Sequence, residues 1–157
     1  KMMAPRVLHL DAAEMPEREL EGARIRVPFG RIAGLESPLP LGSTIGQDAA
    51  LADIAIGHGA AFRCPLEASR NAFVQVIEGT IEIGGERLAT GAAARVATGG
   101  LLEIEAHGEA RIALFVGTPL GEAVMMHGPF AMANAAEVNA AIERYQSGAM
   151  GRLDSLE

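Results

Sequence analysis

Short apolar stretches separated by glycine-containing turns follow one another at near-regular spacing from residue 49 to residue 127. Several of them alternate apolar and polar residues, which is the period of a β-strand with one buried face. Gly84-Gly85 joins two such stretches as the two-residue loop typical of a β-hairpin. The strands that this pattern predicts are 49–56, 72–77, 80–83, 86–88, 93–97, 102–106, 110–116 and 124–127. Many short strands with glycine turns predict an all-β sandwich or barrel of the jelly-roll type.

The first third of the chain follows a less regular pattern. Residues 6–10 are a candidate short strand, and the charged, proline-containing stretch 11–21 is expected to be a loop or a brief helical turn. In 23–27 arginines alternate with apolar residues, as in a half-buried strand. Residues 30–46 are rich in Gly, Pro and Ser and are expected to form a long surface connection. We therefore expect residues 1–46 to be an N-terminal arm with linker strands.

One amphipathic helix is predicted near the C-terminal end. Asn134 is a favourable N-cap, and Glu137 three residues later has the spacing of a capping box. Gly148 occupies the position at which a glycine commonly ends a helix. The apolar residues at helical spacing form one stripe, made of Val138, Ala141, Ile142 and Tyr145. This stripe is expected to pack on the β-structure or on a partner.

The composition narrows the class of protein. The chain has 157 residues, of which 49% are hydrophobic, and this suits one soluble domain with its own core. A net charge of −7 argues against direct binding to nucleic acid, because phosphate binding needs a basic surface. The single cysteine, Cys64, excludes an intramolecular disulfide and favours the cytoplasm, and no stretch is apolar enough to span a membrane. Arginine supplies nearly all the positive charge, which together with abundant Ala and Gly indicates a bacterial chain. Lys1 in front of Met2 leaves open whether this is a complete short protein or part of a longer one.

Several stretches resemble the C-terminal half of the pirin family. They are 24–27, 71–79, 117–124 and 128–134, followed by the predicted helix up to Gly148, and the Gly-Pro-Phe sequence at 128–130 is the most specific of them. Pirins are bicupins, so the resemblance implies an all-β cupin fold, a jelly-roll β-barrel with an N-terminal arm and a short C-terminal α-helix. The implied parts are the arm at 1–46, the cupin barrel at 47–130, and the helix and tail at 131–157.

The resemblance also implies where metal chemistry belongs in this family. The metal of pirins, usually iron, lies in the N-terminal barrel on His and Glu side chains, and this chain resembles only the second barrel. Its first cupin motif corresponds to 65–72, which offers Glu67 and no histidine, and Ala94 falls near the histidine of the second motif. Three ligands are the minimum for a useful site. We therefore predict no metal site and no cofactor in this chain.

The other potentially reactive side chains have simpler interpretations. The histidines, which match no metal-binding spacing and are expected in surface loops or turns, are His9, His58, His107 and His127. Cys64 is expected to be a small buried hydrophobe and not a catalytic thiol. Arg63 and Arg70 flank the first motif near one mouth of the barrel, where they could bind a carboxylate ligand or partner. The alternative for both arginines is an exposed, solubilising role, which is the commoner one.

Three functions remain open at the level of sequence. The preferred one is a non-catalytic assembly or regulatory module that forms a homodimer or binds a separately encoded, metal-bearing cupin barrel, because a lone second barrel would expose the face that pairs with the first. The second is a metal-dependent dioxygenase of the quercetin-oxidising type, with iron, nickel or copper, and it rests on family likeness alone. The third is a small-molecule-binding cupin with a dry interior. The residues expected to face that interior are Phe62, Phe73, Val76 and Leu114.

Overall fold

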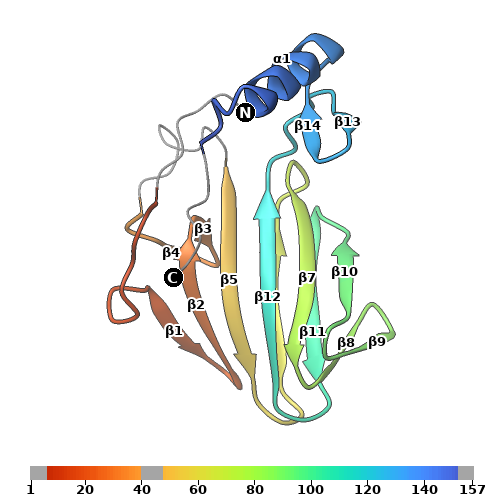
Figure 1. Ribbon diagram of the computed structural model, residues 1–157. Coiled ribbons are helices and arrows are strands. Elements are labelled where there is room, and N and C mark those ends of the chain that lie inside the picture. The colour runs from red at the N-terminus through yellow and green to blue at the C-terminus, as the bar shows by residue number, and fades with distance from the viewer. Residues whose placement is uncertain (1–6, 40–47, 152–157) are drawn as a thin grey trace. The chain divides into compact units, whose positions relative to one another are not determined.

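The computed structural model describes residues 7–39 and 48–151, and these belong to two compact units. The larger unit ends at Pro119, and the smaller unit begins at Leu120 (Figure 1). The predicted barrel extended from residue 47 to residue 130, so the division between the two units falls inside its predicted range. The predicted boundary between residues 46 and 47 lies outside the described residues.

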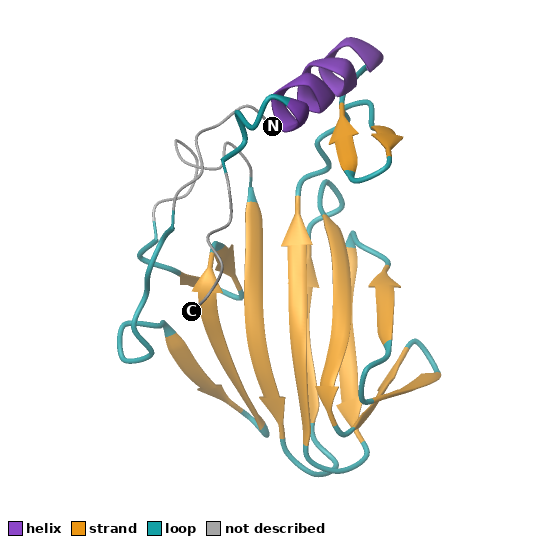
Figure 2. Ribbon diagram, viewed as in Figure 1, coloured by secondary structure: helices purple, strands orange, loops and turns teal. Residues whose placement is uncertain are grey.

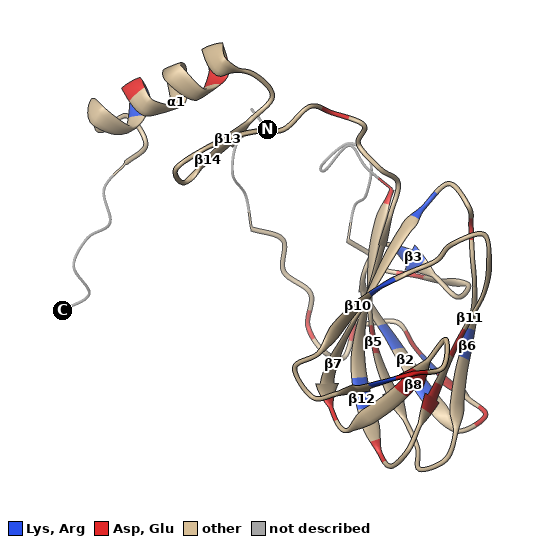
Figure 3. Cartoon of the chain, turned by 90° about the vertical axis from the view of Figure 1, so that its right-hand side faces the viewer, with Lys and Arg blue, Asp and Glu red and all other residues tan. Residues whose placement is uncertain are grey.

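The larger unit contains two antiparallel sheets. The six-stranded sheet has, in spatial order, β1 (Glu17–Leu20), β2 (Ala23–Phe29), β5 (Ala49–Ile56), β12 (Ala110–Gly117), β7 (Asn71–Glu78) and β10 (Ala93–Val96). The four-stranded sheet has β6 (Ala61–Leu66), β11 (Gly100–Ala106), β8 (Thr80–Ile83) and β9 (Glu86–Ala89). A short hairpin of β3 (Arg31–Ile32) and β4 (Leu35–Glu36) follows β2. Figure 3 shows the two sheets edge-on as separate layers.

Alternation along the strands builds the core between the two sheets. Every second residue of β5 and β12 is buried, and the same alternation holds in β7 up to Val76 and in β11 from Leu102, as expected for strands with one inward face. The largest fully buried side chains come from both sheets and include Ile25, Ile54, Ile112 and Leu114 on one side and Phe62, Ile81 and Ile104 on the other. The predicted all-β jelly roll is confirmed, and its two sheets are not joined into one closed ring of strands.

Several strand predictions are confirmed residue by residue. The strand predicted at 49–56 is β5, and the half-buried strand predicted at 23–27 lies in β2. Gly84 and Gly85 form the hairpin between β8 and β9 with φ of +59° and +82°, which is the left-handed conformation that this loop requires. Most of the structure is strand, as Figure 2 shows.

Other predictions are wrong, for physical reasons. Residues 7–10 form no strand, and part of the expected loop at 11–21 is strand β1, which pairs with β2. Strand β6 was not predicted, because Pro65 interrupts its sequence pattern. Proline is tolerated there because β6 lies at the edge of its sheet. The described part of 30–46 includes the β3–β4 hairpin, whose Ile32 is buried in the core.

The strand predicted at 72–77 was expected to place Phe73 and Val76 in the interior. Val74 and Val76 are fully buried, but Phe73 is 41% exposed and Ile77 is 45% exposed. Phe73 therefore lies on the outer face of the six-stranded sheet, and its expected interior position is wrong. Phe62, Val76 and Leu114 lie in the interior as expected.

The smaller unit is a hairpin followed by a helix. Strands β13 (Met125–His127) and β14 (Phe130–Met132) pair, and helix α1 (Ala135–Gln146) follows. The side chain of Asn134 accepts a hydrogen bond from the backbone N–H of Glu137 at 2.9 Å, as the predicted N-cap requires. The backbone N–H groups of Gly148 and Ala149 donate to the carbonyl oxygens of Tyr145 and Arg144, which is a Schellman ending.

The helix buries only part of its apolar stripe. Val138 and Ala141 are buried, whereas Tyr145 is mostly exposed and its ring meets the edge of Phe130 with centroids 6.1 Å apart. No helix in the described parts of the chain is long and apolar enough to cross a membrane.

Candidate functional site

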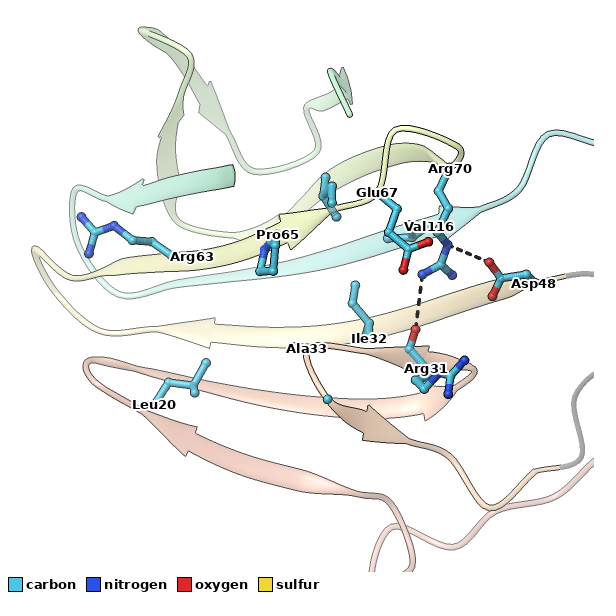
Figure 4. A pocket seen from close by; sticks show the side chains of 12 residues that line it. Leu20, Arg31, Ile32, Ala33, Asp48, Arg63, Pro65, Glu67, Arg70 and Val116 are labelled. Carbon is cyan, nitrogen blue, oxygen red and sulfur yellow. Dashed lines mark hydrogen bonds and ion pairs between the residues drawn. The ribbon is translucent and has the colours of Figure 1, made fainter. Parts of the chain in front are cut away.

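A cavity of about 560 Å³ opens between the β3–β4 hairpin and strand β6 (Figure 4). Its wall includes the buried apolar side chains of Ile32, Leu66 and Val116. Charged groups from several elements reach the same space, namely Arg31, Asp48, Arg63, Glu67 and Arg70. The cavity therefore combines an apolar wall with a charged rim, as small-molecule sites commonly do.

Arg70 is the most deeply placed charged residue of this cavity. Its backbone N–H donates to the Glu67 carbonyl in the turn that leads into β7, and the residue is only 9% exposed. Its Nε lies 3.0 Å from Oδ2 of Asp48, and its Nη1 donates a long 3.5 Å hydrogen bond to the Arg31 carbonyl. The commoner alternative given for Arg70, an exposed solubilising arginine, is therefore wrong.

Arg63 lies elsewhere. It points outward from β6, opposite Glu103 on β11, and its Nε donates to Oε1 of Glu103 at 2.6 Å. Figure 4 shows its side chain extending away from Arg70, at the other end of the cavity. The structure therefore does not bring the two candidate arginines together, and a ligand-binding role for Arg63 and Arg70 stays a prediction.

Cys64 lies in β6 between Arg63 and Pro65, which line the cavity, and it is 1% exposed. Burial raises the pKa of the Cys64 thiol, although the backbone N–H of Ala33 and the positive charge of Arg70 oppose that rise. Ala33 adopts a left-handed conformation with φ of +51°, which is costly for a residue with a Cβ. The side chain of Arg18 stabilises this turn by donating to the carbonyl oxygens of Ala33 and Gly34.

A second feature is a continuous apolar row on the outer face of the six-stranded sheet. The strand registers place Phe29 beside Leu51, Leu51 beside Phe115, and Phe115 beside Phe73. We call these four residues the outer row. The rings of Phe73 and Phe115 lie 5.8 Å apart, and each residue is 41% exposed. A groove of about 820 Å³ lies over the row.

Reasoning from the sequence missed the outer row. Each of its members belongs to a different strand, and only the registers show that they are neighbours. A signal was available in β7 and β12, where Phe73 and Phe115 occupy the outward positions of alternating strands. Aromatic residues at solvent-facing positions indicate a surface that has a partner.

Comparison with known proteins assigns the fold to a family. Residues 51–151 match the model of the pirin C-terminal cupin domain. The chain belongs to the pirin family. It is 29% identical over 150 residues to a pirin-like protein of Caulobacter vibrioides and 26% identical over 157 residues to mouse pirin. These matches cover 94% and 96% of this chain but 53% of each relative, so the chain spans about half the length of these pirins.

A solved structure agrees with this assignment of fold. A quercetin 2,3-dioxygenase from Acinetobacter baumannii superposes with a TM-score of 0.79 at 22% identity. The match covers 92% of this pirin chain and 50% of the dioxygenase.

The metal implied by the family does not fit the residues of this barrel. Ala72, at the end of the first cupin motif, is buried in the core, and Ala94 stands near the position expected for the second-motif histidine. Glu67 is exposed at the rim of the cavity. No three His, Cys, Asp or Glu side chains cluster in the ranges 7–39 and 48–151. Carbon side chains cannot ligate a metal, so the residues at these positions do not supply a ligand set for one.

Proposed function

We propose that this pirin-family chain is a non-catalytic cupin module that assembles through the outer row, with a second copy of the chain as its partner. The observation that carries the proposal is the exposed aromatic pair Phe73–Phe115 on the outer face of the six-stranded sheet. Outer faces of antiparallel sheets normally carry polar residues where they meet water. An aromatic row there favours burial against another protein surface.

The outer row has the composition of an interface centre. It crosses β2, β5, β12 and β7 without a charged residue, and Arg95 on β10 lies beside Phe73 at one end of it and lines the groove. Further along the same face, Asp53 and Arg111 form a two-bonded ion pair at 2.7 and 2.8 Å. An apolar centre beside a charged rim is the usual arrangement at protein interfaces.

The self-complementarity of the outer row supports a second copy as the partner. A twofold interface brings the same patch of each copy together, so the row on one copy meets the same aromatic row on the other. The rings of Phe73 and Phe115 would then be buried against aromatic rings of the second copy. A metal-bearing cupin barrel is the alternative occupant of the same face.

Sedimentation velocity over a range of protein concentrations tests the proposal. We expect the purified chain to form a dimer and Phe115→Glu to weaken that dimer about thirtyfold or more, since the variant places a charge at an interface aromatic. The matched control is Leu101→Glu, because Leu101 is an exposed apolar residue of strand β11 in the other sheet. The control should dimerise like the parent chain.

Two results would overturn assembly with a second copy. One is a parent chain that stays monomeric at micromolar concentration, and the other is a dimer equally sensitive to both variants. A complex formed only with a metal-bearing cupin barrel, and lost in Phe115→Glu, would reassign the face to that partner.

Metal analysis tests the non-catalytic part of the proposal. We expect the purified chain, dialysed against iron, nickel or copper salts, to retain far less than one metal ion per chain. Stoichiometric metal together with consumption of quercetin would establish the dioxygenase alternative instead.

A further inference from the structure

The guanidinium of Arg70 is buried without a full set of hydrogen bonds. Nη2 has no acceptor among the described residues, and the Asp48 oxygen near Nε lies out of line with that N–H group. The side chain is 10% exposed, so water does not replace the absent acceptors freely. An unsatisfied buried donor of this kind raises the free energy of the folded state. Nε and Nη2 together form the edge of a guanidinium that binds a carboxylate through two parallel hydrogen bonds.

The cavity around that edge has room for an organic ligand. Its volume of about 560 Å³ lies within the range of small-molecule sites. Ile32, Leu66 and Val116 supply a buried apolar wall close to Arg70. Figure 4 shows Ile32 and Val116 on the side of the cavity where the Arg70 guanidinium ends.

We propose that this cavity binds a small organic monocarboxylate. The carboxylate accepts hydrogen bonds from Nε and Nη2 of Arg70, and the hydrocarbon part of the ligand packs against Ile32, Leu66 and Val116. This site lies between the sheets and does not involve the outer row. The proposed ligand site is therefore independent of the proposed assembly, and a test of one does not decide the other.

Asp48 is the competitor that the ligand must displace. Its side chain is 53% exposed, and its Oδ2 also accepts a 3.2 Å hydrogen bond from the hydroxyl of Thr118. A carboxylate that is half in water can turn outward at little cost when another takes its place beside Arg70. Removing the negative charge of Asp48 should therefore strengthen ligand binding while it weakens the ligand-free fold.

The charge at the rim restricts the ligand further. The cavity is lined by three arginines and two acids, Arg31, Arg63, Arg70, Asp48 and Glu67, so its formal charge is +1 and one carboxylate balances it. A dianion such as hydrogen phosphate would leave an excess negative charge beside the two acids. The apolar wall in turn favours a ligand with a hydrocarbon body over acetate.

Isothermal titration calorimetry with benzoate as the probe tests the proposal. Benzamide serves as the neutral analogue of the same shape, and acetate and inorganic phosphate as anions without the hydrocarbon body. We expect saturable binding of benzoate, at least tenfold weaker binding of each of the other three, and a tenfold or greater loss of benzoate affinity in Arg70→Lys. Lysine keeps the charge but loses the planar two-bond edge.

Two further variants make the result interpretable. Asp48→Asn should bind benzoate severalfold more tightly, although its melting temperature falls, and these opposite directions would not arise from a purely structural ion pair. Arg87→Gln is the matched control, because Arg87 is an exposed arginine of β9 that pairs with Glu82 and does not line the cavity, and its affinity should equal that of the parent chain.

The proposal is overturned if the parent chain gives no saturable heat with benzoate. It is also overturned if benzamide or phosphate binds as tightly as benzoate. If Arg70→Lys does not fold, the benzoate affinity of Asp48→Asn alone tests the site. Weaker or unchanged benzoate binding in Asp48→Asn would then reject the proposal.

Discussion

At the scale of single residues, Arg70 and Cys64 are two buried polar groups in the same part of the jelly roll, and they are accommodated in different ways. The guanidinium has Asp48 as its ion-pair partner. The thiol is held neutral, because burial disfavours the thiolate by more than Ala33 and Arg70 favour it. The two groups are coupled, since the charge of Arg70 acts on the Cys64 thiol.

The thiol gives a pH-dependent stability with a definite sign. The pKa of Cys64 in the folded state is raised above its ordinary value of 9.0, so the unfolded chain loses this proton at a lower pH than the folded chain does. The protonated thiol therefore contributes to the free energy of unfolding in full below about pH 9, and this contribution is lost as the pH rises toward the folded pKa. We expect the free energy of unfolding, measured by urea titration, to fall above pH 9 with a slope of up to about 1.4 kcal/mol per pH unit.

Cys64→Ala provides the comparison for this prediction. The variant is less stable at every pH because it leaves a small cavity in the core. Its free energy of unfolding should nevertheless change less between pH 8 and pH 10 than that of the parent chain. Parallel pH profiles for the two proteins would show that Cys64 does not titrate as described.

The sequence allowed one of these two residues to be placed correctly. Cysteine is a small apolar side chain in an alternating stretch, so a buried Cys64 could be predicted. The burial of Arg70 could not, because its surroundings come from Asp48 and Arg31, which are distant in the sequence. Arginine on its own indicates exposure, and only the tertiary packing reverses that indication.

At the scale of elements, glycines with positive φ decide where the strands can turn. Gly79 ends β7 with φ of +82°, and a Cβ there would meet the Glu109 carbonyl oxygen and lie 2.9 Å from the Ala110 Cα. Gly91 has almost the same φ, +84°, but a Cβ there meets nothing within 4 Å. Substituting alanine for Gly79 and for Gly91 therefore distinguishes two costs. Both variants have the cost of a positive φ, but only Gly79→Ala adds a clash with neighbouring backbone.

We expect Gly79→Ala to lower the free energy of unfolding by about 3 kcal/mol or more, since conformational strain and overpacking add. Gly91→Ala should lower it by only about 1 kcal/mol, from strain alone. Urea denaturation of both variants and the parent chain measures the difference. Equal losses would mean that the chain beside Ala110 shifts to admit a methyl group at little cost.

The elements themselves were largely predictable where local rules dominate. The Gly84-Gly85 hairpin and the capped helix α1 depend on residues close in sequence, and both were found. Strand β6 was missed because Pro65 suggests a break, and only its edge position makes proline acceptable. Strand β1 was missed because its exposed, charged residues lack the apolar alternation of a strand.

At the scale of the whole molecule, the outer row exists only because four strands pair in one register. Alternation within β7 and β12 could indicate that Phe73 and Phe115 face outward, but no local pattern places Phe29, Leu51, Phe115 and Phe73 side by side, so the row itself could not be predicted from the sequence. The family could be predicted from the sequence, because its motifs are contiguous and include the Gly128-Pro129-Phe130 turn. The proposed assembly therefore rests on geometry, and the family assignment rests on sequence.

Salt dependence distinguishes an assembly held by the outer row from one held by the charged part of the same face. Each copy has a formal net charge of −7, so two copies repel, and salt screens that repulsion without weakening the burial of aromatic rings. Raising sodium chloride from low to high concentration should therefore tighten the dimer severalfold, as measured by sedimentation equilibrium. An interface built on ion pairs around Asp53 and Arg111 would loosen instead. Phe115→Glu should remain largely monomeric at both salt concentrations, because screening cannot remove the cost of burying its carboxylate against the outer row of a partner.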